Sequence, residues 1–426
     1  MSKTSNLFDV VVIGGGPAGM ATASVTSKVG LRTLIIEREE KLGGILKQCI
    51  HDGFGVVKFN KRLSGPEYAH RYVKIIEEMK IEVYNKTFVS KVEKIEDVFE
   101  LTLVNSNEGV FIVSSKVVVL ATGCRERTSK QVFINGTRPS GIYSAGTAQY
   151  FTNILGYLPC KKCVILGSGD IGLIMARRLK LEGAEVLGVY EAKGIPSGLS
   201  RNISQCLQDF SIPLHLSHTV TRVFGEYKLE GVEVCRVNER MEPVKGTEEI
   251  IECDGLILSV GLIPENEVAE SLGVDMDNST KGPKVDQNFM SSIRGVFSCG
   301  NALHVNDLVD YVSESGELAG RAIGEYINYY KEPFNTPIEY EKENFLYITP
   351  QRINLSSNNS HLTLYFRSLE VKKNVQVNLI LDHNVIFSKK YSSMNPSEME
   401  RLQIDLEKLN IRKDSILKFT MEELTS

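Results

Sequence analysis

The chain has no tryptophan and no long hydrophobic run. None of its apolar stretches reaches the ~20 residues that a membrane-spanning helix needs, so we expect no membrane span. The eight cysteines are scattered, which suits a reducing compartment better than a disulfide scaffold. Few residues precede the first apolar strand, so we expect no signal peptide. We therefore expect a soluble, cytoplasmic protein whose near-ultraviolet signal comes from tyrosine and any bound chromophore.

An excess of either charge is also missing. The 49 basic and 53 acidic residues leave a net charge of −4, which gives no reason to expect nucleic acid or an anionic membrane as a partner. Apolar residues make up 42% of the chain, which is enough for packed cores. The length of 426 residues suggests roughly three domains.

What the chain does contain is two glycine-rich turns of one kind. Residues 14–19 read Gly-Gly-Gly-Pro-Ala-Gly, and residues 167–172 read Gly-Ser-Gly-Asp-Ile-Gly. Each turn follows an apolar strand and opens a helical stretch, and each is followed by an acid, Glu37 or Glu191. Such glycines permit a tight turn, close approach of backbone to phosphate and close helix–strand packing, and the acid can accept ribose hydroxyls. Two such motifs predict two bound dinucleotides and electron transfer between them.

The elements around these motifs divide the chain. The first βαβ unit and its further strands are predicted at residues 8–13, 17–29 (the helix), 32–37, 81–89, 97–104 and 110–121. The second unit is predicted at residues 163–191, with strands near 214–224 and 229–236. A long helix over residues 307–330 follows where the chain has returned to the first domain. We expect a first domain of residues 1–124 and 255–335, with a second domain of residues 125–254 nested in it. The crossings lie near Gly123 and Gly261.

The C-terminal part of the chain, its tail, has a different residue pattern. Residues 345–368 and 374–391 alternate apolar and polar side chains, and turn-forming residues separate them. This pattern predicts antiparallel strands and a small β-sandwich over residues 340–426. Such a domain can be an accessory cap, or it can dock a partner or a second copy of the chain.

Four motifs occur in the order seen in a known family. They are the turn at 14–19 with Glu37, Ala121-Thr122-Gly123, the turn at 167–172, and Gly-Val-Phe-Ser-Cys-Gly-Asn at 295–301. Over about residues 1–330 the chain resembles the flavoproteins with two dinucleotide-binding domains, relatives of thioredoxin reductase, glutathione reductase and NADH oxidase. The resemblance and the tail together imply an α/β fold: an FAD-binding Rossmann-like domain, an inserted NAD-binding Rossmann-like domain and a small C-terminal all-β domain.

Three longer phrases resemble a narrower group. They span residues 43–55, 121–128 and 299–312. Two C-terminal segments, residues 349–353 and 395–399, also resemble this group. That group holds the FAD subunits that accompany glycerol-3-phosphate dehydrogenase-like proteins and amino-acid or opine dehydrogenase complexes. The resemblance therefore implies a partner dehydrogenase subunit.

The family resemblance implies that the first motif holds FAD and the nested one holds NAD(H). The implied FAD site comprises Gly14, Gly16, Pro17, Ala18, Gly19, Glu37, Arg38, Gly44, Ile45, Val89, Ala121, Thr122, Gly123, Gly300, Asn301 and Leu308. The implied NAD site comprises Gly167, Gly169, Asp170, Ile171, Gly172, Glu191 and Gly261. Most relatives carry aspartate at position 301, and asparagine keeps hydrogen-bonding capacity but loses the charge.

Two further expectations concern charge. The helix that starts near Asp307 would aim its positive end at the N1–C2 edge of the flavin. Glu191 favours the free ribose of NADH over the 2′-phosphate of NADPH, and only Lys193 argues against that preference.

Cysteine pairs beside the flavin are missing where disulfide reductases of the family carry them. After Gly43-Gly44 those places hold Leu46 and His51, with Cys49 standing alone, and residues 143–148 contain no cysteine. Cys49 and His51 are the candidate catalytic residues. Their alternative is packing against the flavin or bonding to backbone.

Two other groups of residues can hold a redox pair or a metal. Cys160-Lys-Lys-Cys163 is a C-x-x-C, and without a second one we interpret it as structural. His304, Asp307 and Asp310 are assigned by resemblance to the entrance of the flavin-side helix, so we expect no metal site.

Three functions remain open from the sequence. The first is an FAD-dependent NAD(P)H oxidoreductase, with NADH preferred, that acts as the electron-transfer subunit of a dehydrogenase complex. The second is a stand-alone NADH oxidase or peroxidase that uses Cys49. The third is a non-catalytic flavin-holding scaffold for assembly.

Overall fold

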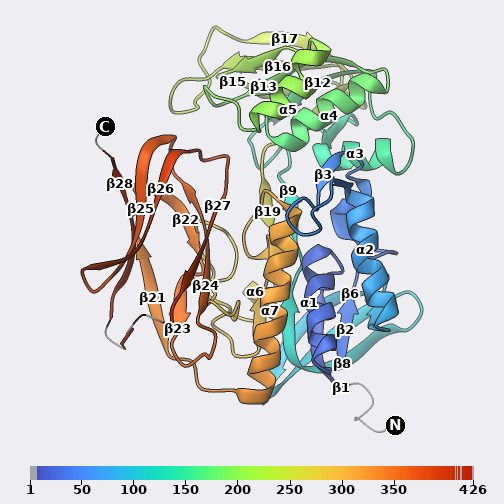
Figure 1. The fold of residues 1–426 in the computed structure, drawn as a ribbon. Coiled ribbons are helices and arrows are strands. Elements are labelled where there is room, and N and C mark those ends of the chain that lie inside the picture. The colour runs from blue at the N-terminus through green and yellow to red at the C-terminus, as the bar shows by residue number, and fades with distance from the viewer. Residues whose placement is uncertain (1–6, 408, 410, 413–414, 425–426) are drawn as a thin grey trace. The chain divides into compact units, whose positions relative to one another are not determined.

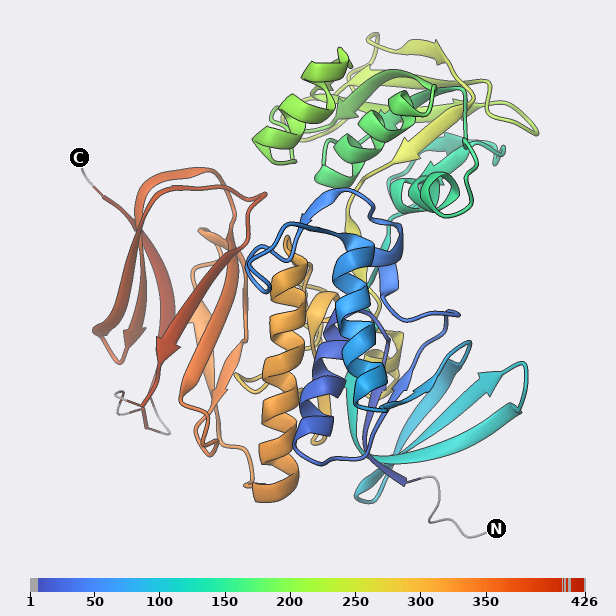
Figure 2. The same ribbon diagram turned by 45° about the vertical axis from the view of Figure 1, so that its right-hand side comes forward.

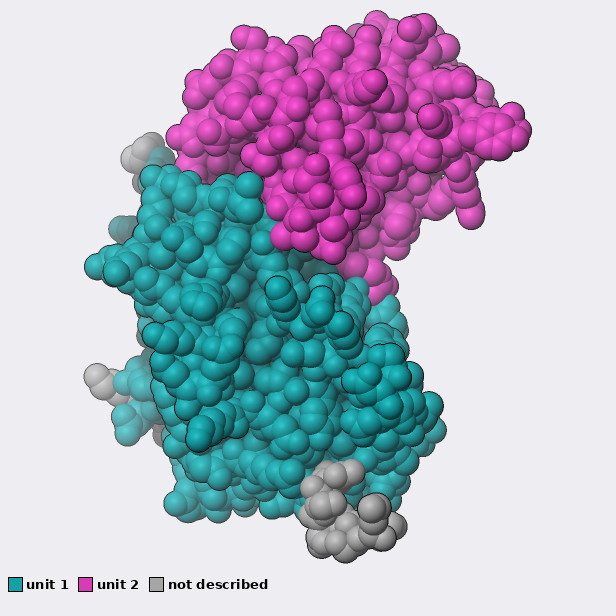
Figure 3. Space-filling view, turned by 90° about the vertical axis from the view of Figure 1, so that its right-hand side faces the viewer, with its two compact units in different colours: residues 1–124, 264–426 teal, residues 125–263 magenta. Residues whose placement is uncertain are grey.

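The computed structural model describes residues 7–407, 409, 411–412 and 415–424. The chain divides into two compact units, residues 1–124 with 264–426 and residues 125–263, which Figure 3 colours separately. The segments that link the units are short strands, β9 (Cys124–Glu126) and β19 (Leu262–Pro264), and they pair with each other. Among the described residues, no helix has both the length and the apolar character to cross a membrane.

The first unit is built on one mixed sheet. Its strand order is β5-β2-β1-β8-β7-β6, with β20 also paired to β8. The strands are β1 (Leu7–Ile13), β2 (Thr33–Ile36), β5 (Glu82–Tyr84), β6 (Phe88–Ile95), β7 (Val98–Asn105), β8 (Gly109–Leu120) and β20 (Val296–Ser298). β5, β2, β1, β8 and β20 run parallel, whereas β6 and β7 form an antiparallel hairpin. Val10, Val11 and Val12 have no exposed surface, as expected for a parallel strand covered on both faces.

The single strand predicted over residues 81–89 was wrong. The chain turns at Lys86, whose φ is 52°. Residues 82–84 then extend the parallel part of the sheet, and residues 88–95 pair with β7. The sequence of a short apolar run interrupted by a turn does not indicate which strand each half will pair with.

Three helices cover one face of this sheet. They are α1 (Pro17–Lys28), α2 (Gly65–Glu78) and α7 (Val309–Tyr329), and their buried side chains share one core with Val10 and Val12 of β1. The opposite face packs against α6 (Glu267–Ser271) and the hairpin β6–β7. α1 and α7 lie side by side (Figures 1 and 2), and Thr22 Oγ1 donates a hydrogen bond of 2.9 Å to the Gly316 carbonyl.

The nested unit holds two sheets. A parallel sheet has the order β11-β18-β12-β13-β14, and a second sheet has the order β10-β15-β16-β17. The parallel sheet contains β11 (Ile142–Ser144), β12 (Lys162–Leu166), β13 (Glu185–Glu191), β14 (Leu214–Leu216) and β18 (Gly255–Leu258). The second sheet contains β10 (Asn135–Gly136), β15 (His218–Phe224), β16 (Gly231–Arg236) and β17 (Glu249–Glu252). Its helices are α3 (Ala145–Asn153), α4 (Asp170–Leu181), α5 (Ser200–Cys206) and η3 (Gln208–Phe210).

Two details differ from the sequence expectations. Residues 214–224 form two strands in different sheets, because Ser217 adopts a φ of 55° and breaks the run. β18, which the sequence assigned to the first domain, pairs with β11 and β12 in the nested unit. The chain returns to the first unit only at Pro264.

The C-terminal region is all β, as the alternating pattern predicts, and the fold class is confirmed. One sheet has the order β23-β21-β28-β25-β26 and the other β22-β24-β27. The strands are β21 (Asn335–Tyr340), β22 (Phe345–Thr349), β23 (Arg352–Asn354), β24 (His361–Ser368), β25 (Lys372–Leu381), β26 (Asn384–Met394), β27 (Glu400–Asp405) and β28 (Leu417–Glu423). They share a hydrophobic core of their own. Contacts such as Tyr365 Oη to Glu314, 3.0 Å, tie β24 to α7.

Candidate functional site

The carboxyl ends of four parallel strands meet at one edge of the first sheet. Gly14 N–H donates to the carbonyl of Ile36 at 2.9 Å, and Ala121 N–H donates to the carbonyl of Ile13 at 3.0 Å. Cys299 N–H donates to Leu120 in the same way, at 3.1 Å. The glycine-rich turn, the acid Glu37, the Ala-Thr-Gly motif and Gly300 are therefore gathered at this edge. Open α/β sheets bind their ligands at such edges.

The turn at residues 14–19 is shaped by glycines that no other residue can replace. A Cβ on Gly14 would lie 2.3 Å from the Ala121 carbonyl oxygen, and a Cβ on Gly19 would lie 1.9 Å from the Gly14 carbonyl oxygen. Gly16 is different, because nothing lies within 4 Å of the place its Cβ would take. It is the N-cap of α1 and no side chain caps the helix there. The first-turn amides of α1 thus face open space beside Gly16, which fits a pyrophosphate.

Glu37 is held with its carboxylate at the same turn. The residue is 6% exposed, and its Oε2 accepts the Gly15 N–H at 2.8 Å while Oε1 accepts the Glu39 N–H at 2.8 Å. Each oxygen therefore keeps lone pairs for the hydroxyls of a ribose. Thr87, which the sequence did not single out, lies beside this acid, since its N–H donates to the Glu37 carbonyl at 3.0 Å.

Gly300 and Asn301 lie at the far side of the edge, next to the start of α1. A Cβ on Gly300 would lie 2.7 Å from Ala18 Cβ, and its N–H donates to Ser315 Oγ at 2.9 Å. The side chain of Asn301 accepts the Asn306 N–H at 3.0 Å and donates to Cys124 Sγ at 3.5 Å. An aspartate could accept the first of these bonds but could not donate the second, so asparagine suits this chain.

Of the remaining residues of the predicted FAD site, some lie at the glycine-rich turn and others do not. A Cβ on Gly44 would approach Gly16 Cα to 3.2 Å, so Gly44 lies at the glycine-rich turn. Arg38 instead pairs with Glu265 at 3.1 Å, and the Ile45 side chain is 61% exposed. The structure does not bring the Val89 side chain to the edge, because it is buried in the core beneath the hairpin β6–β7.

The Ala-Thr-Gly motif and the helix start complete the set. Thr122 Oγ1 donates to the Glu265 carbonyl at 2.6 Å, and Gly123 adopts a φ of 75° where the chain leaves the first unit. Pro17 is in the first turn of α1, and Leu308 is the N-cap of α7 with no side-chain cap.

Sequence reasoning named Asp310 but not its role in closing the loop after Cys49 and His51, and it missed Lys58 and Glu317. Asp310 is 4% exposed and accepts the N–H groups of Gly55 at 3.1 Å and Lys58 at 2.6 Å. Lys58 Nζ also pairs with Glu317, at 2.5 Å. The loop at 52–58 is therefore fastened to the first three turns of α7. Only the spacing of Asp310 and Glu317 on one face of the helix hints at this in the sequence.

Cys49 and His51 lie just before the 52–58 loop, and their surroundings differ from those of a catalytic cysteine and histidine. Burial raises the pKa of the Cys49 thiol to about 12, and its Sγ contacts the Ile45 carbonyl at 3.4 Å. The ring of His51 packs on Phe54, with ring centroids 4.9 Å apart. Reactive cysteines have lowered pKa values, so a neutral thiol here fits a packing role better than a nucleophile.

The nested turn repeats the parts of the first one. A Cβ on Gly167 would lie 2.0 Å from the Ser259 carbonyl oxygen, and one on Gly172 would lie 2.6 Å from the Gly167 carbonyl oxygen. Gly169 is the N-cap of α4, again without a side-chain cap. The predicted residues Asp170 and Ile171 form the first turn of α4. This cradle also fits a dinucleotide pyrophosphate.

Glu191 is more heavily hydrogen-bonded than Glu37. Its Oε2 accepts from Ser168 N at 3.0 Å, Ser168 Oγ at 2.6 Å and Ser197 Oγ at 3.1 Å, and Oε1 accepts from Lys193 N at 3.1 Å. The Leu199 N–H donates to Asp170 at 2.9 Å. Residues 193–199 thus lie against the turn, and Lys193 is held there by its backbone. Gly261 adopts a φ of 100° and its carbonyl accepts the Arg127 N–H at 3.1 Å.

Cys160 and Cys163 are both buried at the start of β12. A Cβ on Gly255 would lie 2.7 Å from Cys160 Sγ, so both cysteines pack against β18. The hydrogen bond with Cys160, with burial next, raises the pKa of Cys163. These contacts agree with the structural interpretation of the C-x-x-C.

His304, Asp307 and Asp310 do not converge. Asp307 faces the C-terminal sheet, where Met399 N–H donates to it at 2.6 Å, and Asp310 faces the 52–58 loop. The ring of His304 lies between Tyr347 and Tyr365, with centroids 5.8 Å and 5.1 Å away.

The burial of His304 predicts acid sensitivity. Burial, aided by the charge of Arg367, lowers the pKa of His304 from 6.5 to about 3. The folded chain therefore binds fewer protons than the unfolded chain between these values, and stability is lost as the pH falls below 6.5. Between pH 7.5 and 5.5 this one group should remove about 1.4 kcal/mol from the free energy of unfolding. Urea titrations of the wild type and of His304→Phe check it, and an equal pH dependence in both would contradict it.

Known proteins share this arrangement. A family model described as pyridine nucleotide-disulphide oxidoreductase matches residues 8–325. Hydrogen cyanide synthase subunit HcnB of Pseudomonas protegens is 27% identical over 293 residues, which is 64% of this chain and 60% of that protein. The NADH dehydrogenase of Bacillus subtilis is 28% identical over 298 residues, 69% of this chain and 53% of that protein. The chain thus spans a little over half the length of these two relatives.

A solved structure shows the same fold. Thioredoxin reductase of T. acidophilum superposes with a TM-score of 0.61 at 21% sequence identity, covering 75% of this chain and 99% of that one. The family match covers well over half of the chain and both glycine-rich turns. The chain therefore belongs to the pyridine nucleotide-disulphide oxidoreductase family, whose members use FAD and NAD(P)H.

Proposed function

We propose that the chain is the electron-transfer subunit of a dehydrogenase complex, in which hydride passes between NADH and FAD. A partner subunit oxidises glycerol 3-phosphate or a similar hydroxy or amino compound. The observation that carries this proposal is the pairing of two glycine-rich turns suited to dinucleotides with a single, half-buried thiol, Cys49, after Gly44. Electrons then need a route other than a disulfide at the usual positions.

The residues of the chain hold and orient the two nucleotides. The amides at the starts of α1 and α4 bind the pyrophosphates, and Glu37 and Glu191 accept the ribose hydroxyls. The flavin supplies the hydride-accepting centre when it is bound. The side chains that follow Gly44 offer no dithiol, because Leu46 and His51 occupy the positions where disulfide reductases carry cysteine.

Three features support a partner subunit. The relative HcnB is named as a subunit of hydrogen cyanide synthase. The match to the family ends at residue 325, so the C-terminal sheets lie beyond it and offer a surface for assembly. The resemblance of residues 43–55 and 299–312 to FAD subunits of dehydrogenase complexes supports the same role.

The preference for NADH rests on Glu191. Its carboxylate is 7% exposed, and a 2′-phosphate beside it would place like charges together. Lys193 is the one nearby cation in the segment that follows, and its backbone N–H already bonds to Glu191 at 3.1 Å. We therefore expect NADH to be used at least tenfold more efficiently than NADPH.

An anaerobic stopped-flow experiment tests the proposal. The purified chain, loaded with FAD, is mixed with NADH or NADPH, and the loss of flavin absorbance is followed. Fast bleaching by NADH with negligible turnover on oxygen, and turnover restored by the partner subunit, is the expected result. Flavin that neither nicotinamide reduces would instead support the non-catalytic scaffold, and rapid oxygen-linked turnover by the isolated chain would support an NADH oxidase.

Replacement of Cys49 separates the last two mechanisms. Burial raises the pKa of the Cys49 thiol to about 12, so the reactive thiolate is a minor form at pH 7. We expect Cys49→Ser to leave bleaching by NADH, and any peroxide-linked NADH oxidation, within twofold of the wild type. A loss of peroxide turnover in Cys49→Ser, with bleaching retained, would point to a sulfenic acid at this cysteine.

A further inference from the structure

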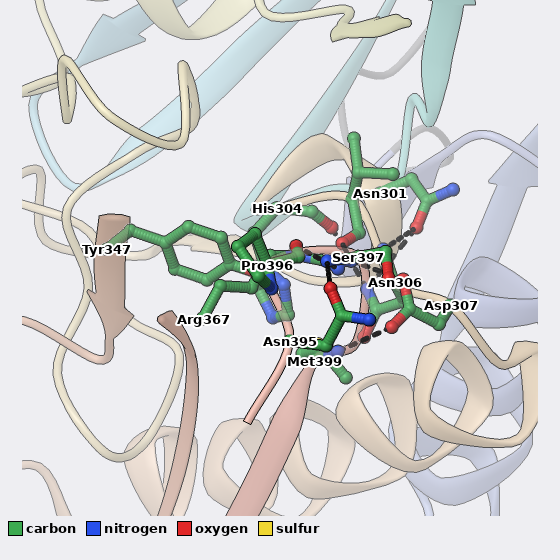
Figure 4. Close-up of polar contacts among 11 residues, drawn as sticks. Asn301, His304, Asn306, Asp307, Tyr347, Arg367, Asn395, Pro396, Ser397 and Met399 are labelled. Carbon is green, nitrogen blue, oxygen red and sulfur yellow. Dashed lines mark hydrogen bonds and ion pairs between the residues drawn. The ribbon is translucent and has the colours of Figure 1, made fainter. Parts of the chain in front are cut away.

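The segment between β20 and α7 carries Gly300 and Asn301 and ends at the N-cap of α7, Leu308. We refer to residues 301–308 as the pre-α7 segment. Its first half is closed by its own groups. Asn301 Oδ1 accepts the backbone N–H of Asn306 at 3.0 Å, and Asn306 Nδ2 donates to the His304 carbonyl at 2.9 Å (Figure 4).

The second half is held from outside, by the C-terminal sheet. The guanidinium of Arg367, on β24, forms an ion pair with Asp307 and donates to the carbonyl of Val305 at 3.5 Å. It also donates to Tyr347 Oη at 3.2 Å and to the Pro396 carbonyl at 3.3 Å. The Arg367 side chain is 12% exposed. Its donors are thus divided between the pre-α7 segment and its own sheet (Figure 4).

Both oxygens of Asp307 are engaged by this sheet. Oδ1 pairs with Arg367, and Oδ2 accepts the Met399 N–H at 2.6 Å. A carboxylate just before a helix is well placed to cap the first-turn amides and to cancel their positive charge. Here Asp307 is turned away and paired with Arg367, and the N-cap of α7, Leu308, makes no side-chain cap hydrogen bond. The acid in the first turn of α7, Asp310, accepts the N–H groups of Gly55 and Lys58 instead.

We propose that Arg367 is a positioning residue for the flavin: from the C-terminal sheet it fixes the pre-α7 segment and neutralises Asp307. The start of α7 can then present its positive end to the flavin. This inference rests on the FAD site of the proposed function. It also gives the C-terminal region a role in tuning the cofactor rather than only in covering α7.

A second cation on the same sheet supplies a matched control. Arg401, on β27, pairs with Glu314 of α7, and Tyr365 Oη donates to the same carboxylate at 3.0 Å. Its side chain is 22% exposed, comparable to Arg367. It joins the same sheet to the same helix, but beyond the first turn. Loss of Arg401 tests the attachment of the sheet without touching the pre-α7 segment.

The experiment compares Arg367→Gln, Arg367→Lys and Arg401→Gln. Three quantities are measured: the Kd of FAD from flavin fluorescence, the midpoint potential of the bound flavin, and amide hydrogen exchange of residues 301–309 in the FAD-free protein. We expect Arg367→Gln to weaken FAD binding at least tenfold, to speed exchange over 301–309, and to lower the potential. A tenfold greater loss of affinity for reduced than for oxidised flavin corresponds to about 30 mV for two electrons. Arg367→Lys should restore the potential but not the exchange protection.

Each outcome decides the inference. Wild-type Kd, potential and exchange in a folded Arg367→Gln protein would overturn it, and so would equal effects of Arg367→Gln and Arg401→Gln. Should Arg367→Gln fail to fold, Arg367→Lys carries the test, because unchanged exchange over 301–309 in that variant would also overturn it. A wild-type protein that binds no FAD would count against the proposed function instead.

Discussion

Replacing Gly316 with alanine is expected to lower the free energy of unfolding of the first unit by about 3 kcal/mol or more. Gly316 lies where α7 crosses α1, and a Cβ there would stand 2.2 Å from the Ala18 carbonyl oxygen. The obstacle is backbone, so no rotamer change relieves it, and the helices have to move apart. Separation would also break the 2.9 Å hydrogen bond from Thr22 Oγ1 to the Gly316 carbonyl.

The same helix offers a matched control in Gly324→Ala. A Cβ on Gly324 would meet a Val29 methyl group at 3.3 Å, which a small side-chain adjustment relieves. Because alanine is the better helix former, this change should be neutral or stabilise by up to about 1 kcal/mol. Thermal unfolding followed by circular dichroism checks both variants, with roughly 2–4 °C expected per kcal/mol. Equal melting temperatures for the two variants would contradict the close-packed crossing.

The sequence predicts the parts of this fold whose information is local. A glycine turn, a helix and an acid that follow one another in the chain predict β1, α1 and Glu37, and the same logic predicts β12, α4 and Glu191. Partner choice between strands is not local. The residues near Lys86 do not indicate that the following strand pairs in a hairpin. The apolar run of β18 is equally compatible with a strand of either domain.

The site residues also fall into those that local sequence predicts and those that depend on distant segments. The glycine-rich turns and the acids that follow them could be predicted, because the backbone geometry of the turn requires those residue types. The roles of Asp310 and Arg367 could not be predicted, because each acts on a segment far away in the chain, the 52–58 loop or the pre-α7 segment. Val89 stays a predicted residue of the FAD site, and the structure shows only that its side chain lies in the core beneath the hairpin β6–β7. A resemblance gives a position along the chain, but the direction of a side chain depends on which strand pairs beside it.

Removing the two acids in turn should separate the two nucleotide sites. Glu37→Ala is expected to yield a protein that loses FAD, since Glu37 lies at the first turn with the Gly15 N–H on its Oε2 at 2.8 Å. Glu191→Ala should keep FAD and its colour, but NADH should bleach it about 100-fold less efficiently. That factor corresponds to about 2.7 kcal/mol, the value of one or two hydrogen bonds to a charged group.

Ser197→Ala is the matched control in the nested site. Ser197 Oγ donates to Glu191 Oε2 at 3.1 Å, so the change removes one donor and leaves the carboxylate. The rate of bleaching by NADH should stay within about threefold of the wild type, because a ribose hydroxyl can take the vacated lone pair. Circular dichroism confirms folding, and Glu37→Gln and Glu191→Gln replace the alanine variants where these do not fold. Loss of FAD from Glu191→Ala, or normal bleaching of it by NADH, would reverse or remove the assignment of the nested turn to NADH.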